Sequence, residues 1–166
     1  MKRPLIAFAA ELVACRPPPS ETEVPAPGGP TTVAEAPPEA AALIQAAMPG
    51  FTIMSVEREE ADGRTEWEVA GADAQGTPYE FDIMQSGADF SVLEIQRDIA
   101  WQDTPQAVPD AVASAPNGFE PVRVIESRQP ADGSVVYGLF TIDQPAHQAV
   151  MEVRYMDGEA AIRPPA

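Results

Sequence analysis

The segment TEWEVAGADAQGTPYEFDI, residues 65–83, decides the fold because it holds two runs of alternating apolar and polar residues. The first run places Trp67 and Val69 on one side of an extended chain and glutamates on the other. The second run, Tyr79–Ile83, does the same with three apolar side chains and two carboxylates. Successive side chains of a strand point to opposite faces, so each run predicts a strand with one buried face. Ala74–Pro78 predicts the turn between them.

The same pattern extends along the chain in both directions. We predict further strands over residues 51–59, 90–97, 120–128, 134–142 and 149–156, and a short edge strand over 159–163. Asp157-Gly158 stands between the last two strands. This dipeptide is a strong signal for a tight hairpin.

Two helices are expected, each ahead of a group of strands. Residues 38–48 begin with a Pro-Glu pair, which suits the first turn of a helix, and they end at Pro49-Gly50. Their alanine-rich middle has strong helix propensity. Residues 109–115 are the second and shorter candidate, which ends at Pro116-Asn117-Gly118.

This order of helix and strands occurs twice at nearly fixed spacing. Phe51 and Phe119 are 68 residues apart, and two Asp-Gly turns recur at a distance of 70 residues. A constant spacing favours duplication of one unit. We therefore expect an α+β fold of two helix-plus-antiparallel-strand units, over residues 38–103 and 104–166, which form a meandering sheet with the helices on one face.

The repeated motifs resemble those of a PepSY-like domain. They are Pro49-Gly50-Phe51, Asp62-Gly63 and Tyr79–Ile83 in the first unit, and Gly118-Phe119, Asp132-Gly133 and Met151-Glu152-Val153 in the second. The resemblance covers about residues 38–162, and tandem units of this kind are similar in layout to the β-lactamase inhibitor protein. It implies a protein that binds or inhibits another protein and is not an enzyme.

Residues 1–14 have the pattern of a signal peptide, with two basic residues ahead of a short apolar run. Leu12-Val13-Ala14-Cys15 ends this run and resembles the lipobox of bacterial lipoproteins. The resemblance implies that Cys15 becomes the first residue of the mature chain and carries a lipid that anchors it. Glu11 departs from the pattern, because a carboxylate in the apolar run opposes insertion. The alternative is an ordinary secretory leader followed by a free cysteine.

Residues 15–37 consist of Cys15, the expected site of the lipid, and the proline-rich stretch that follows it. Such a stretch has too few apolar side chains to order itself, and its prolines favour extended segments. We expect a semi-stiff tether that holds the domain away from a membrane; the alternative is a proline-rich recognition ligand. The anchor places the domain in the cell envelope, facing the periplasm. Within the lipoprotein resemblance, Arg16 after the cysteine favours the outer membrane.

The charge of the chain excludes one class of partner. The 166 residues carry a formal net charge of −16, with 26 acidic residues against 10 lysines and arginines. This charge repels nucleic acid and anionic headgroups, so no nucleic-acid function is expected. It suits a solvated surface, a basic protein partner or weak binding of divalent cations.

No catalytic constellation is recognisable in the sequence. His147 is the only histidine, and the motifs of zinc, thiol-redox and nucleotide chemistry do not occur. We therefore expect neither enzymatic activity nor a cofactor, and we interpret His147 as an exposed loop residue.

Three aromatic residues are candidates for contact with a partner. Trp101 lies in the connector between the two units, and aromatic residues are enriched at binding hot spots. Packing between the units is the alternative interpretation of Trp101. Tyr79 and Tyr137 are the other two candidates.

Four carboxylates around the first predicted hairpin are weak metal candidates: Glu57, Glu59, Glu60 and Asp62. Glu66 and Glu68 lie on the following predicted strand, and pairing of the two strands would crowd several carboxylates on one sheet face. Calcium prefers oxygen ligands, but the spacing is not that of a calcium-binding loop. Arg58 and Arg64 lie near enough in the sequence to neutralise the cluster.

Together these observations predict a non-catalytic envelope lipoprotein. It would bind a protein or peptide of the envelope through one sheet face or near Trp101, and one form of such binding is inhibition of a hydrolase. The alternative is an acidic Ca²⁺ buffer or sensor in the periplasm.

Overall fold

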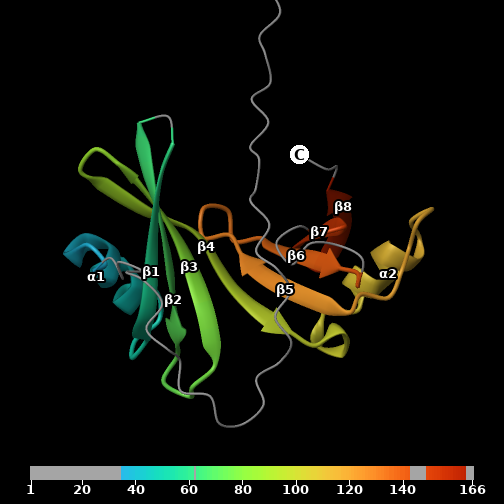
Figure 1. Ribbon diagram of the computed structural model, residues 1–166. Helices are drawn as coiled ribbons and strands as arrows, with labels where there is room; N and C mark the ends of the chain where they lie inside the picture. Colours follow the sequence, from blue (N-terminus) through green and yellow to red (C-terminus); the bar gives the residue numbers. More distant parts are fainter. Residues whose placement is uncertain (1–34, 62, 143–148, 164–166) are drawn as a thin grey trace, which may run out of the picture. The chain divides into compact units, whose positions relative to one another are not determined.

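Eight antiparallel strands form one sheet in which each strand lies beside the next along the chain (Figure 1). The computed structural model describes residues 35–61, 63–142 and 149–163. Its elements in chain order are α1 (Pro38–Ala47), β1 (Thr52–Ala61), β2 (Arg64–Ala72), β3 (Pro78–Ser86), β4 (Asp89–Ile99), the 3₁₀ turn η1 (Trp101–Asp103), α2 (Ala107–Ala113), β5 (Arg123–Arg128), β6 (Val135–Phe140), β7 (Met151–Met156) and β8 (Glu159–Arg163). The strands predicted from alternation are confirmed, and so is the tight hairpin at Asp157-Gly158, where both residues have positive φ.

The expected α+β class is wrong, because the protein is mainly β. Its α-helices have only ten and seven residues, whereas all eight strands form a continuous sheet. Pro105 precedes α2 and Pro116 follows it, which leaves room for about two turns. Within the described ranges, no helix is long and apolar enough to cross a membrane.

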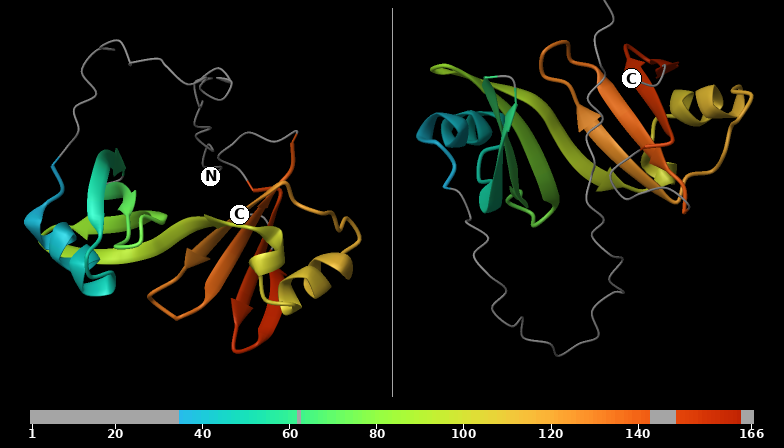
Figure 2. Two further views of the ribbon diagram at one scale, coloured as in Figure 1. Left: turned by 90° about the horizontal axis from the view of Figure 1, so that it is seen from below. Right: turned by 45° about the horizontal axis from the view of Figure 1, so that its top comes forward.

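β4 joins the first group of strands to the second (Figure 2). Its residues Asp89–Gln96 pair with β3, and Ile95–Ile99 pair with β5. The boundary expected between residues 103 and 104 therefore follows a strand that is hydrogen-bonded to both groups. The described residues belong to one compact unit.

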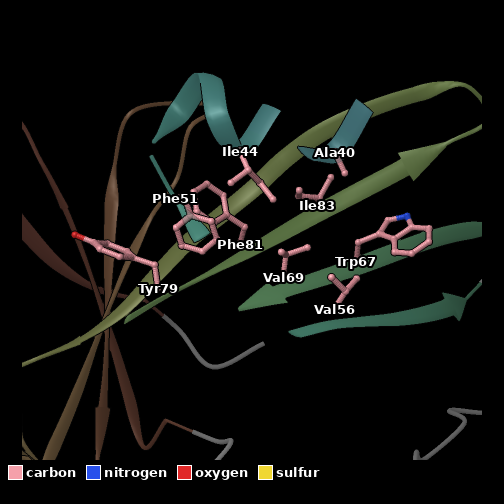
Figure 3. Packing of buried hydrophobic residues seen from close by; sticks show 9 residues of the cluster. All are labelled: Ala40, Ile44, Phe51, Val56, Trp67, Val69, Tyr79, Phe81 and Ile83. Carbon is pink, nitrogen blue, oxygen red and sulfur yellow. The ribbon is translucent and has the colours of Figure 1, made fainter. Parts of the chain in front are cut away.

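The first hydrophobic cluster lies between α1 and β1–β4 (Figure 3). Its buried members are Ala40, Ile44, Phe51, Val56, Trp67, Val69, Tyr79, Phe81 and Ile83. The rings of Phe51 and Phe81 meet edge to face with their centres 5.1 Å apart. Gly71 lies so close to Phe51 that a Cβ there would come within 2.6 Å of the ring. A side chain at this position would therefore displace the centre of the cluster.

The second hydrophobic cluster lies between α2 and β5–β8, on the same face of the sheet. Its buried members are Val108, Val112, Val124, Tyr137, Leu139 and Val153. Phe81 opposes Ile95 on β4, and Ile99 further along that strand opposes Val124. Directly opposed residues share a face, as do residues two apart on a strand, so both helices cover one face. No described helix covers the other.

A polar seam separates the two clusters on the covered face. Arg97 donates from Nε to Glu126 Oε1 at 2.9 Å and from Nη1 to the Tyr79 hydroxyl at 3.2 Å. Arg128 forms a second ion pair with Glu126, at 3.1 Å. Burial and the nearby Glu126 carboxylate raise the pKa of Tyr137 to about 12. The seam thus links β3, β4 and β5 through charge-assisted contacts beside a phenol that stays protonated.

Replacing Phe81 by alanine tests the first cluster. Phe81 is fully buried, so Phe81→Ala leaves a cavity and is expected to lower the free energy of unfolding by about 3–5 kcal/mol. Chemical denaturation followed by tryptophan fluorescence measures this loss. Met54→Ala is the control, since Met54 is 73% exposed, and it is expected to change the free energy by less than about 0.5 kcal/mol. An equally small loss for Phe81→Ala would contradict the packing of the cluster.

Candidate binding face

Carboxylates lie side by side across four strands on the face opposite α1. Glu57 of β1 opposes Glu68 of β2. Glu68 in turn opposes Asp82 of β3, which opposes Glu94 of β4. Opposed residues on antiparallel strands have Cβ atoms about 4.5–5.5 Å apart, and like charges at that separation destabilise a sheet. These four residues are called the carboxylate row below.

Further carboxylates flank the row on the same face. Glu59 opposes Glu66 on one side of it. Glu80 precedes Asp82 by two residues on the other side, and residues two apart on a strand share a face. The carboxylate row and these three glutamates together make up the acidic face.

The two arginines expected to neutralise these carboxylates lie elsewhere or make no bond to them. Arg58 is on the other face of β1, where it pairs with Glu60 and lies over the Trp67 ring at 5.4 Å. Arg64 is at the start of β2 and forms no ion pair with a described residue. Within the described part of the chain, five glutamates of the acidic face also have no hydrogen bond or ion pair: Glu57, Glu59, Glu66, Glu68 and Glu80.

Neutral donors hold Asp82 and Glu94, the two carboxylates of the row that lie nearest the middle of the sheet. Gln96 donates from Nε2 to Asp82 Oδ2 at 2.7 Å and to Glu94 Oε2 at 3.3 Å. Ser127 Oγ donates to Glu94 Oε2 and accepts from Gln129 Nε2 at 2.9 Å. These bonds fix the side chains across β3, β4 and β5 without supplying positive charge.

Two carboxyl groups of the row, Asp82 and Glu68, have pKa values above the ordinary range. Burial raises the pKa of Asp82 to about 7, and the carboxylates of Glu80, Glu94 and Glu68 add to the rise against the opposing hydrogen bond from Gln96. Burial also raises the pKa of Glu68, with smaller contributions from Glu80 and Glu57 and their neighbours. Burial is the larger cause of both rises, and the neighbouring carboxylates add a repulsion that a bound cation would relieve.

A groove of about 460 Å³ adjoins the acidic face at Glu80. Met54 of β1 and Ile125 of β5 both line it, although their strands are not neighbours in the sheet. The sheet therefore curls toward its acidic face. Arg123 and Asp98 also line the groove and pair with each other, with Nε–Oδ1 at 2.6 Å. The groove thus offers apolar side chains beside an ion pair.

The four metal candidates do not form one cluster. Glu57 and Glu59 lie on the acidic face, but alternation puts Glu60 on the other face with Arg58. Asp62 lies outside the described residues. In the ranges that the structure describes, no group of three or more acidic, histidine or cysteine side chains could hold a metal ion. The calcium alternative has no geometric support there.

The aromatic candidates lie on the helix-covered side of the sheet. Trp101 is half-buried and packs against the second hydrophobic cluster. Tyr79 is exposed over 9% of its surface and is one of the residues that line the groove, whereas Tyr137 is exposed over only 3%. Cys15 and His147 lie outside the described residues.

Sequence reasoning missed half of the carboxylate row. It grouped the glutamates of the first hairpin but left out Asp82 and Glu94, which are far from them in the sequence. The alternation of Glu80 and Asp82 with apolar residues was the available signal, since it places both opposite the core. Which carboxylates become neighbours depends on the register between strands, and nothing in the alternation specifies that register.

Comparisons with known proteins return no match: no protein family matches the chain, and neither a curated protein nor a solved structure is similar to it. The PepSY-like resemblance therefore stays a prediction from short motifs.

The raised pKa of Asp82 predicts that stability depends on pH. Above about pH 4 the unfolded chain has released the proton of Asp82, whereas the folded protein keeps it up to about pH 7. The contribution of Asp82 to the free energy of unfolding therefore falls as the pH rises from about 4 through about 7. Asp82→Asn is neutral at every pH and its amide oxygen still accepts from Gln96. At pH 8 we expect this variant to be more stable than the wild type by about 1–2 kcal/mol, after allowance for solvent screening.

Denaturation curves at pH 4.5 and pH 8 measure the effect, and the two proteins are expected to converge at the lower pH. Glu120→Gln, in the exposed loop before β5, removes the same charge away from the acidic face and serves as the control. A difference between Asp82→Asn and wild type that is the same at both pH values would contradict the assignment.

Proposed function

We propose that this protein is a non-catalytic binding protein of the cell envelope, and that its acidic face binds a cationic segment of another protein or peptide. The observation that carries the proposal is the carboxylate row, whose register places Glu57, Glu68, Asp82 and Glu94 on successive strands. No described cation bonds to the row.

The charge arrangement supports a polypeptide ligand better than a small ion. The carboxylates spread over four strands and alternate with core residues, and they do not converge on one point as metal ligands do. Lysine and arginine side chains along a polypeptide match such a spread. A potential of one sign over a whole face also steers an oppositely charged partner into encounter.

The position in the cell is proposed from the sequence. A lipid on Cys15 and a proline-rich tether over residues 15–37 would hold the domain at a membrane, with Arg16 favouring the outer one. The partner is then a protein or peptide of the envelope. The PepSY-like resemblance suggests that this binding inhibits the partner, a hydrolase being the first class to test.

A charge-matched pair of variants tests the acidic face. Glu57→Gln/Glu68→Gln is expected to weaken binding of a lysine-rich decapeptide at least about tenfold at low salt, because close charge pairs are lost. Glu120→Gln/Glu159→Gln removes the same net charge from exposed positions outside the acidic face and is expected to stay within about twofold. Titration calorimetry at two ionic strengths measures both. Equal losses in the two variants, or no binding by the wild type, would sink the proposal.

Intact-mass analysis tests the anchor. Protein from the membrane fraction is expected to begin at Cys15 and to carry added lipid mass, which disappears in Cys15→Ser. The serine variant is expected in the soluble fraction, since several acyl chains are needed for stable anchoring and it would carry none. An unmodified wild-type mass would exclude the lipid anchor but leave the acidic face to be tested separately.

A further inference from the structure

The first strand of the sheet has a free edge within the described structure. β1 pairs with β2 on one side, and the strand order places nothing beyond it on the other. The register shifts once, between Ile53 and Ser55, and then runs unbroken from Ser55 to Ala61. Alternate backbone N–H and C=O groups of that stretch point away from β2. Such an edge is a template for an additional strand.

The edge borders the most acidic part of the face. Glu57 and Glu59 of β1 and Glu68 of β2 line a hollow of about 250 Å³, together with Arg58. A strand added beside β1 would lie about 4.8 Å from it, and its alternate side chains would stand directly opposite Glu57 and Glu59. A lysine or arginine at those positions would reach both the glutamates and the hollow.

We propose, building on the proposed function, that the cationic partner binds as an extended strand on the free edge of β1, with basic side chains at every second position on the acidic face. Backbone hydrogen bonds to Ser55–Ala61 then supply affinity. The spacing of Glu57 and Glu59 selects the alternation of the basic side chains.

Charge selects this occupant over a second copy of the chain. Pairing β1 with another β1 would bring Glu57 and Glu59 of one copy beside glutamates of the other, and like charges opposite each other destabilise a sheet. The chain's own residues 16–34 contain six prolines. Proline cannot donate to a ladder of hydrogen bonds, so this segment is a poor strand.

The opposite edge of the sheet is a poorer template. β8 has only five residues against ten in β1, and its Arg163 already pairs with Glu152 at 3.6 Å. A peptide strand added beside β8 would need a different pattern of charges from one added beside β1. β8 therefore serves as an internal control for binding at β1.

Backbone methylation of a synthetic peptide tests the mode of binding without altering the protein. The parent probe is an acetylated, amidated peptide of alternating lysine and threonine, nine residues long. One derivative carries N-methyl groups on the lysine amides and the other on the threonine amides. In an extended strand these two sets of amides point to opposite edges, so only one set can face β1. We expect one derivative to lose at least about tenfold in affinity for the full-length protein and the other to stay close to the parent.

The outcomes separate this inference from the proposed function. Binding of both derivatives like the parent would overturn strand addition and leave charge recognition by the acidic face intact. Equal loss by both derivatives would also overturn it, because a single edge cannot engage both sets of amides. Failure of the parent peptide to bind would overturn the proposed function itself.

Amide hydrogen exchange gives a second and independent readout. With the parent peptide bound, exchange is expected to slow in Ser55–Ala61 of β1 and to stay unchanged in Glu159–Arg163 of β8. Slowing at β8, or none at β1, would place the peptide elsewhere and overturn the assignment.

Discussion

The pairing of β4 with two neighbours is the constraint on which the rest of the structure depends. β4 is the longest strand, and only Ile95 and Gln96 pair with β3 and β5 at once. The polar seam reinforces this junction, since Arg97 of β4 bonds to Tyr79 of β3 and to Glu126 of β5. The Glu126 side chain is only 12% exposed, so losing both of its arginine partners, Arg97 and Arg128, would leave a largely buried charge uncompensated. Without this junction, each helix would cover a separate four-stranded sheet.

The like charges of the acidic face destabilise the sheet, and hydrophobic burial on the covered face offsets this loss of stability. Opposed like charges destabilise antiparallel strands, and here they recur on four strands in succession. The same strands bury Val69, Phe81 and Ile83 completely on their other side, and each such side chain contributes about 1.5–3 kcal/mol by leaving water. Gln96 and Ser127 limit this destabilisation further by satisfying Asp82 and Glu94 with neutral hydrogen bonds. The pKa of Asp82, raised first by burial and then by the carboxylates of Glu80, Glu94 and Glu68, reflects in part the repulsion that remains.

Local patterns in the sequence were sufficient to predict the strands and the buried face of the first hydrophobic cluster. They were not sufficient to predict the class of fold or the acidic face. Alternation assigns Trp67 and Val69 to the buried face, and the structure confirms it. Two helical segments with strands between them suggested an α+β protein, yet helix length and the continuation of β4 into the second group depend on contacts distant in sequence. In the same way, adjacent glutamates looked like a cluster. Glu60 follows Glu59 directly, so alternation places the two side chains on opposite faces. Glu94 is twelve residues from Asp82, yet strand pairing places the two side by side.

Core and acidic face are two sides of the same strands, so one register fixes both. A slip of one residue in β2 would expose Val69 and turn Glu68 toward the core, which hydrophobic burial forbids. The carboxylates therefore cannot separate by sliding past one another. Protonation relieves their repulsion, as at Asp82, and so does a bound cation. Above about pH 7 Asp82 has lost its proton, and the repulsion that the register maintains becomes a driving force for binding a positively charged partner.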